Sequence, residues 1–170
     1  SSRSTLPRST SAVATSTGST FRELGVPGPL AGVLDTQSIT VPTPIQAATL
    51  PDSLAGRDVL GRGRTGSGKT LAFVLPLVAR LQSSGKRAAP KRPRALILAP
   101  TRELVAQIDA TLAPLATVAG LRTRTVFGGV GQNPQVQALR AGVDILIATP
   151  GRLEDLIGQG VCDLGAVEVT

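Results

Sequence analysis

The segment GRTGSGKT at residues 63–70 constrains this chain more than any other, because it fits the pattern GxxxxGK[ST] without a mismatch. Glycines in this pattern let the backbone curl until several amide N–H groups converge on phosphate oxygens, and the lysine adds a positive charge. A helix that starts at the end of the loop also directs its positive end toward the anion. The segment therefore predicts a binding site for a nucleoside triphosphate.

The last residue of the pattern carries a hydroxyl that is placed to bind Mg²⁺. We expect Lys69 and Thr70 to act on the phosphates, with Thr70 as the metal ligand. The predicted phosphate site comprises Gly63, Arg64, Thr65, Gly66, Ser67, Gly68, Lys69 and Thr70. The alternative of a glycine-rich turn without chemical function stays open for an isolated match.

A dinucleotide site is a second alternative, because Gly61, Gly63 and Gly66 have the spacing GxGxxG. In that fold an acidic residue about 20 positions later binds the ribose. No Asp or Glu occurs between Asp58 and Glu103, so the sequence argues against this reading.

Composition excludes several other kinds of site. The chain has no histidine and one cysteine, Cys162, which excludes disulfide frameworks, Cys/His zinc sites and histidine-dependent catalysis. We expect Cys162 to be a small buried apolar residue. The 170 residues suit one globular domain, and no apolar stretch approaches membrane-spanning length, so we expect a soluble, cytoplasmic protein.

The net charge of +7 arises in two segments, residues 1–20 and 83–94, which carry basic residues and no acid. The first is rich in Ser and Thr, and we expect residues 1–18 to form a disordered tail. The second contains Lys86 to Arg94 and reads as an exposed loop. A basic loop can contact a polyanion or can simply be solvated, and its sequence favours the second role.

From residue 56 onward, short β-branched runs alternate with helical patterns, which predicts an α/β fold with a mostly parallel sheet and helices on both faces. The expected strands are Asp58–Leu60, Ala95–Leu98, Thr123–Phe127, Asp144–Ala148 and a run that begins at Val167. The expected helices are Lys69–Leu81, Arg102–Val118, Pro134–Arg140 and Arg152–Ile157. Right-handed crossovers place every loop that follows a strand at the same edge of such a sheet.

Four of these loops carry unusual residues: the phosphate loop after Leu60, Pro100–Glu103, Gly128–Gly129 and Thr149–Arg152. Thr149 is a plausible helix N-cap, with Pro150 at the first helical position, and such a helix end binds phosphate well. Each segment alone is also explained by a turn or by a helix start. Their order and their shared edge are what indicate a common function.

In this order the motifs resemble the first RecA-like domain of DEAD-box RNA helicases: an aromatic at Phe21, a Q motif at residues 38–46, GxxxxGKT, PTREL, GG and TPGR. The resemblance implies ATP with Mg²⁺ as the cofactors and RNA as the partner, held by its sugar-phosphate backbone. It implies that Gln46 binds the adenine edge and that Phe21 packs on the ring. The residues implied to contact RNA are Pro100, Thr101, Arg102, Gly129, Thr149, Gly151 and Arg152.

By the same resemblance, residues 19–47 form the Q-motif region and residues 48–170 a partial N-terminal RecA-like P-loop NTPase domain, incomplete at its C-terminus. Ser38 and Ile39 depart from the usual Q motif, and no Asp-Glu-Ala-Asp sequence or second RecA-like domain is present. We therefore expect the 170-residue chain alone to lack RNA-stimulated ATPase activity.

Alternatives remain for individual residues and for the whole chain. Gln46 also completes a capping box with Thr43, and Phe21 fits an ordinary core position. Two other functions also fit the chain: a non-catalytic module that binds RNA or a protein partner, and a DNA helicase or other P-loop ATPase of the same superfamily.

Overall fold

The computed structural model describes residues 19–62 and 68–170, so the predicted tail at 1–18 and loop residues 63–67 lie outside the described residues. The helices are α1 (Gly28–Thr36), α2 (Pro44–Leu54), α3 (Lys69–Ser84), α4 (Arg102–Val118), α5 (Asn133–Ala141), α6 (Pro150–Gly158) and the 3₁₀ turn η1 (Leu164–Ala166). The strands are β1 (Ala95–Leu98), β2 (Thr123–Val126) and β3 (Ile145–Ala148).

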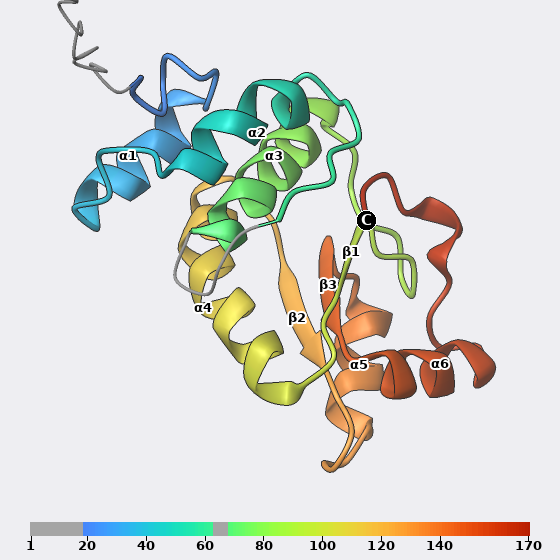
Figure 1. Cartoon of the computed structure of the whole chain (residues 1–170). Coiled ribbons are helices and arrows are strands. Elements are labelled where there is room, and N and C mark those ends of the chain that lie inside the picture. The colour runs from blue at the N-terminus through green and yellow to red at the C-terminus, as the bar shows by residue number, and fades with distance from the viewer. Residues whose placement is uncertain (1–18, 63–67) are drawn as a thin grey trace, which may run out of the picture.

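The three strands form a parallel sheet in the order β1-β3-β2, which confirms the predicted α/β fold (Figure 1). The central strand β3 is buried along its whole length, as a strand covered on both faces must be. In register, Leu98 of β1 and Val126 of β2 both lie opposite Ala148 of β3. The three strands therefore end level with one another, and the loops that follow them start at one edge.

Helices cover both faces of the sheet, as predicted. Ile97, Ile145 and Ile147 face one core, which they share with α1, α2, α3 and α4. Leu96 and Leu146 face a second, smaller core with α5 and α6. Neighbouring residues of a strand point to opposite faces, so a four-residue strand of apolar residues supplies both cores. Figure 1 shows the two helical layers on either side of the strands.

Most element boundaries agree closely with the sequence prediction. The helix over Arg102–Val118 and the strand over Ala95–Leu98 have the predicted bounds, and α3 continues three residues past Leu81. Helix α4 begins where Thr101 accepts a hydrogen bond from the N–H of Leu104 (3.2 Å) through its side chain. Helix α3 ends at Ser84 and is followed by Gly85, whose φ of 64° is the left-handed conformation typical of a helix terminus.

The predicted strand at Asp58–Leu60 is wrong, because residues 57–62 form no regular structure and are exposed. A strand is stabilised by hydrogen bonds to a neighbouring strand, and within residues 19–62 and 68–170 no strand lies beside this segment. In the described part of the chain, the run that begins at Val167 forms a single bridge with the sheet instead of a strand. Val169 forms a parallel bridge with Ala95 and accepts a hydrogen bond from the N–H of Leu96 (3.0 Å).

A buried arginine organises the opposite edge of the sheet, where the strands begin. Arg94 is only 3% exposed, and its guanidinium contacts Glu168 (3.0 Å), Asp144 (3.4 Å) and the carbonyl of Leu81 (2.8 Å). These partners belong to the C-terminal segment, the start of β3 and the end of α3. One side chain from the basic segment therefore connects three parts of the chain.

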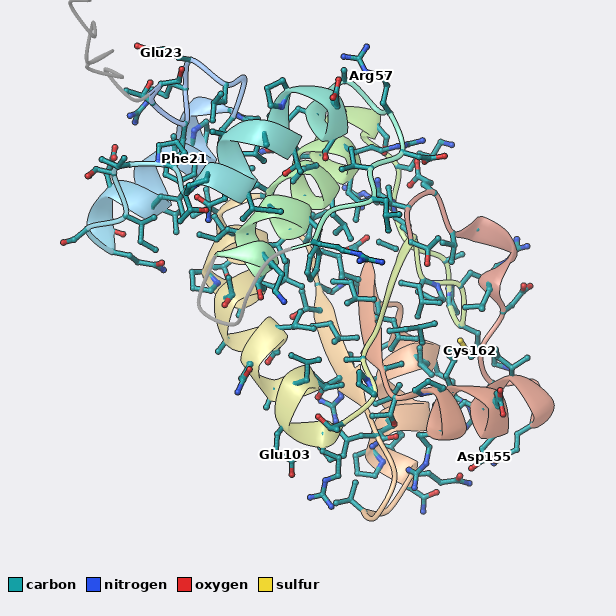
Figure 2. The ribbon with its side chains drawn as sticks, viewed as in Figure 1. Phe21, Glu23, Arg57, Glu103, Asp155 and Cys162 are labelled. Carbon is teal, nitrogen blue, oxygen red and sulfur yellow. The ribbon has the colours of Figure 1, made fainter. Side chains whose placement is uncertain are left out.

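Cys162 is buried in the smaller core, as predicted (Figure 2). Burial, and after it the negative charge of Asp163, raises the pKa of the Cys162 thiol above its ordinary value. Across residues 19–62 and 68–170, no helix combines the length and the apolar character needed to cross a membrane.

Candidate functional site at the carboxyl edge of the sheet

The loops that follow β1, β2 and β3 meet at the edge where the three strands end. Hydrogen bonds continue past the strands, from the N–H of Ala99 to the carbonyl of Ala148 and from the N–H of Thr149 to the carbonyl of Val126 (both 3.0 Å). Helices α4, α5 and α6 begin after these loops, so the positive ends of three helices lie at this edge (Figure 1). The predicted common edge is confirmed for these three loops. It is not confirmed for the phosphate loop, because residues 57–62 before it form no strand.

Arg102 connects the first of these loops to the second. Its guanidinium lies over the ring of Phe127, with Cζ 5.2 Å from the ring centroid, in a cation–π contact. Gly129 has a φ of 79°, and a Cβ atom built on it would lie 2.8 Å from Nη1 of Arg102. The glycine therefore provides both a left-handed turn and the space that the guanidinium occupies.

Arg152 connects the third loop to the second. Its Nη2 donates to the carbonyl of Val130 (3.0 Å), and its Nη1 donates to Oε1 of Gln135 (3.1 Å). The amide Nε2 of Gln135 in turn donates to the carbonyl of Phe127 (3.1 Å). Arg102, Phe127, Gln135 and Arg152 thus form one continuous set of contacts across three loops.

The structure brings together all seven residues predicted to contact RNA, on these three loops. Five of them are exposed and two, Thr149 and Arg152, are partly exposed. The exposed ones are Pro100, Thr101, Arg102, Gly129 and Gly151. Within the described part of the chain no backbone N–H donates to the side chain of Thr149, in contrast to Thr101, whose hydroxyl caps α4. Glu103, in the first turn of α4, is also exposed (Figure 2).

Of the predicted phosphate loop, the structure describes Gly68, Lys69 and Thr70, and the other five residues lie outside the described part. Gly68 has a φ of 82° and is the N-cap of α3, so the helix starts at Lys69 as predicted. A Cβ atom on Gly68 would clash with Nε2 of Gln46 and would lie 3.0 Å from Oγ1 of Thr43, so this left-handed turn favours glycine. Lys69 and Thr70 line a cavity of about 550 Å³ between α2, α3 and β1.

Gln46 and Phe21, predicted to bind adenine, are both buried in this structure. Gln46 is 1% exposed; its Nε2 donates to the carbonyl of Gly68 (3.0 Å) and its Oε1 accepts from the N–H of Thr43 (2.9 Å). The second bond is one of the two hydrogen bonds of a capping box between Thr43 and Gln46, the alternative role that the sequence indicates for Gln46. Phe21 is 3% exposed and packs in the larger core (Figure 2). Their contact with adenine stays a prediction.

Sequence reasoning missed Gln135, the residue that joins the second loop to the third. The sequence spacing contains a signal for Gln135: it lies four residues before Leu139, so the two share one face of α5, where both are buried. A glutamine on the apolar face of a helix needs hydrogen-bond partners. The prediction of an exposed loop from Lys86 to Arg94 is wrong for Arg94, which is buried among its hydrogen-bond partners, and Arg92 pairs with Asp163 (3.1 Å).

Comparison with known proteins places most of the chain in one family. Residues 43–169 match the family model described as DEAD/DEAH box helicase. Over 153 residues the chain is 43% identical to the ATP-dependent RNA helicase RhlB of Sodalis glossinidius, covering 88% of this chain and 36% of that protein. It is 51% identical over 123 residues to the ATP-dependent RNA helicase dbp3 of Sclerotinia sclerotiorum, covering 72% of this chain and 20% of that protein.

A solved structure shows the same fold. The ADP-bound structure of the RNA helicase Prp28 from Chaetomium thermophilum superposes with a TM-score of 0.79 at 40% identity. The match covers 86% of this chain and 36% of Prp28. The chain therefore spans about a third or less of the length of these relatives.

Proposed function

This chain belongs to the DEAD/DEAH box helicase family, and we propose that it is the ATP-binding and partial RNA-binding domain of an ATP-dependent RNA helicase. The observation that carries this proposal is the connected edge: Arg102, Gly129 and Arg152 belong to one set of contacts. The start of α3, with Lys69 and Thr70, faces the neighbouring cavity. The nucleotide would then bind at the start of α3, and the nucleic acid at the loops that follow the three strands.

On the nucleotide side, Lys69 supplies a positive charge to the phosphates, and the start of the 16-residue helix α3 adds its positive end. Thr70 would be the protein ligand of Mg²⁺, a cation that takes oxygen ligands and keeps several waters. The left-handed turn at Gly68 and the Thr70 hydroxyl fit that chemistry. When bound, Mg²⁺ neutralises charge on the phosphates.

We propose that Gln46 and Phe21 recognise adenine, which would make the nucleotide ATP. A glutamine amide can donate and accept hydrogen bonds at the adenine edge at the same time. Each end of the Gln46 amide is engaged by one backbone group, and the amide has a second N–H and a second oxygen lone pair with which to meet adenine. Replacing Gln46 with Ala should therefore lower ATP affinity and reduce the preference for ATP over GTP, which competition with a fluorescent nucleotide would measure.

On the RNA side, two arginines and three helix N-termini at one edge favour phosphate groups over bases. The described residues contain three aromatics, all Phe, and two of them, Phe21 and Phe127, are held in contacts within the protein. Little surface is therefore present on which bases could stack. Binding is expected to tolerate sequence changes in the RNA and to weaken as salt is raised.

The test is phosphate release by the complete protein that contains this chain, with single-stranded RNA, with DNA of the same sequence, and without nucleic acid. We expect stimulation by RNA and its loss in the variant Lys69→Ala. Stimulation by DNA alone would favour a DNA helicase, and RNA binding without phosphate release would favour a non-catalytic module.

The 170-residue chain by itself is expected to show no RNA-stimulated phosphate release above the Lys69→Ala variant. Phosphoryl transfer needs acidic groups that hold the metal and orient the attacking water. Among the described residues, no three His, Cys, Asp or Glu side chains gather as a metal-binding group. Activity of the short chain above that control would contradict this expectation.

A further inference from the structure

Gln135 is a polar side chain in a position that otherwise suits an apolar residue. It is 4% exposed and lies on the inner face of α5 beside Leu139. A buried amide that lacks partners is strongly unfavourable, because it loses its hydrogen bonds to water. Gln135 therefore depends on the two partners that it has, and both belong to loops of the candidate site.

The two partners lie at opposite ends of the same amide group. Its N–H donates to the carbonyl of Phe127, immediately before Gly128 and Gly129, and its oxygen accepts from Arg152 after β3. The amide plane thus fixes the position of one loop relative to the other. A carboxylate or a hydroxyl at the same position could not donate and accept across this span in the same way.

Arg152 is oriented by this contact. A guanidinium has five N–H groups in a rigid plane, and two of them are used by Oε1 of Gln135 and the carbonyl of Val130. The remaining N–H groups are held in a defined direction on a partly exposed side chain. An arginine that is already ordered loses less conformational freedom when it binds phosphate.

We propose that Gln135 is a positioning residue for RNA binding, which holds Arg152 and the Phe127–Gly129 loop in the arrangement that receives the RNA backbone. The inference rests on the proposed function, and it assigns Gln135 no direct contact with RNA.

The experiment measures binding of fluorescein-labelled single-stranded oligo(U) to the complete protein at several KCl concentrations, together with binding of a fluorescent ADP analogue. In Gln135→Met the side chain keeps its approximate size but loses both hydrogen bonds. We expect about tenfold weaker RNA binding, as for the loss of a hydrogen bond to a charged group, and unchanged ADP binding. The double variant with Arg152→Ala should bind RNA less weakly than the two single effects combined predict, because one of the two contacts of Gln135 is already lost in Arg152→Ala.

The salt dependence separates positioning from a general structural effect. Each phosphate contact to single-stranded nucleic acid contributes about 0.7 to the slope of log K against log salt concentration. Gln135→Met removes no charge, yet it should lower this slope by about the same amount as Arg152→Ala. A fall in affinity with an unchanged slope, additive with Arg152→Ala, would overturn the inference.

Gln159→Met is the matched control, because Gln159 and Gln132 form an exposed amide pair (3.0 and 3.1 Å) that also connects the region before α5 to α6. It should leave RNA affinity unchanged, and a loss equal to that of Gln135→Met would overturn the inference. If Gln135→Met unfolds, Arg152→Lys serves instead. Lysine keeps the charge but has no planar guanidinium, so it cannot donate to Oε1 of Gln135 and to the carbonyl oxygen of Val130 at the same time. Arg152→Lys should therefore weaken RNA binding, and an unchanged RNA affinity would overturn the inference.

Failure of the proposed function gives a different result. If the wild-type protein does not bind RNA, or if Arg152→Ala leaves RNA affinity unchanged, the assignment of this edge to RNA is wrong. If Arg152→Ala weakens binding and Gln135→Met does not, only the role of Gln135 is wrong.

Discussion

Gly129 has two roles in the candidate RNA site: it adopts a left-handed backbone conformation, and it leaves space for the Arg102 guanidinium. Its φ of 79° is in the left-handed region, which costs a residue with a Cβ atom about 1–2 kcal/mol. The same Cβ atom would displace the Arg102 guanidinium. We therefore expect Gly129→Ala to lower the free energy of unfolding by about that amount and to weaken RNA binding, as measured by urea unfolding and by fluorescence anisotropy.

Gly128 provides the control for this prediction. It lies next in the chain, its φ is not positive, and a Cβ atom on it would meet nothing within 4 Å. Gly128→Ala should leave both stability and RNA affinity nearly unchanged. Equal losses in the two variants would show that the steric contact between Gly129 and Arg102 has no part in binding.

At this scale the sequence predicts residues that belong to motifs and misses residues that connect them. Arg102 and Arg152 were identified because their segments follow strands in a recognisable order. Gln135 was not, because its function depends on two partners, Phe127 and Arg152, that folding brings to it from other loops. For Gln46 the sequence predicts two roles instead of none, because a glutamine at this position fits a capping box and an adenine contact equally well.

Among the elements, the start of β1 depends on one buried ion-pair network. Arg94 contacts Asp144 and Glu168 and is almost fully buried, so removing its charge leaves those carboxylates without their partner. Breaking such a buried pair typically costs about 3–5 kcal/mol. We expect Arg94→Leu to lower the free energy of unfolding by about 3 kcal/mol, measured by urea unfolding.

Arg92 supplies the matched comparison, two residues away in the same segment. It pairs with Asp163 at 3.1 Å, but both side chains are about half exposed. Exposed pairs contribute up to about 1 kcal/mol, because water and salt screen them. Arg92→Leu should therefore lower the free energy of unfolding much less than Arg94→Leu does. Similar decreases in the two variants would argue against a special role for burial of the Arg94 ion pairs.

The remaining charges of the basic segment are expected to have no part in RNA binding. The segment precedes β1, so it joins the sheet at the edge opposite to the candidate site (Figure 1). Arg87→Gln together with Lys91→Gln should leave the salt dependence of RNA binding unchanged in the complete protein. A smaller slope in this double variant would place RNA on this edge as well.

The elements that the sequence predicts well are those whose partners lie in the described chain. Strand β1 and helix α4 have their predicted bounds, since apolar spacing and the cap at Thr101 are local signals. The run at Asp58–Leu60 has the same β-branched character but no neighbouring strand among the described residues. Strand propensity alone does not supply the hydrogen bonds that make a strand.

For the molecule as a whole, the cavity beside α3 exposes a group of apolar side chains. Val59, Leu60, Phe73 and Leu98 all line it and are all exposed, with Leu60 at 96%. Burying such surface stabilises an association by about 25 cal/mol per Å². Apolar side chains gathered in one place favour self-association, in contrast to apolar residues scattered over a surface. We expect the isolated 170-residue chain to self-associate as its concentration rises.

Leu60→Lys tests this expectation with little effect on the stability of the fold, because the Leu60 side chain is almost fully exposed within the chain. The substitution raises the net charge from +7 to +8, which by itself opposes association. Val41→Lys makes the same change at a residue that is 69% exposed and does not line the cavity. Sedimentation velocity should show a severalfold weaker association for Leu60→Lys than for Val41→Lys. Equal effects would mean that net charge, and not the cavity surface, governs association, and a monomeric wild-type chain would contradict the expectation altogether.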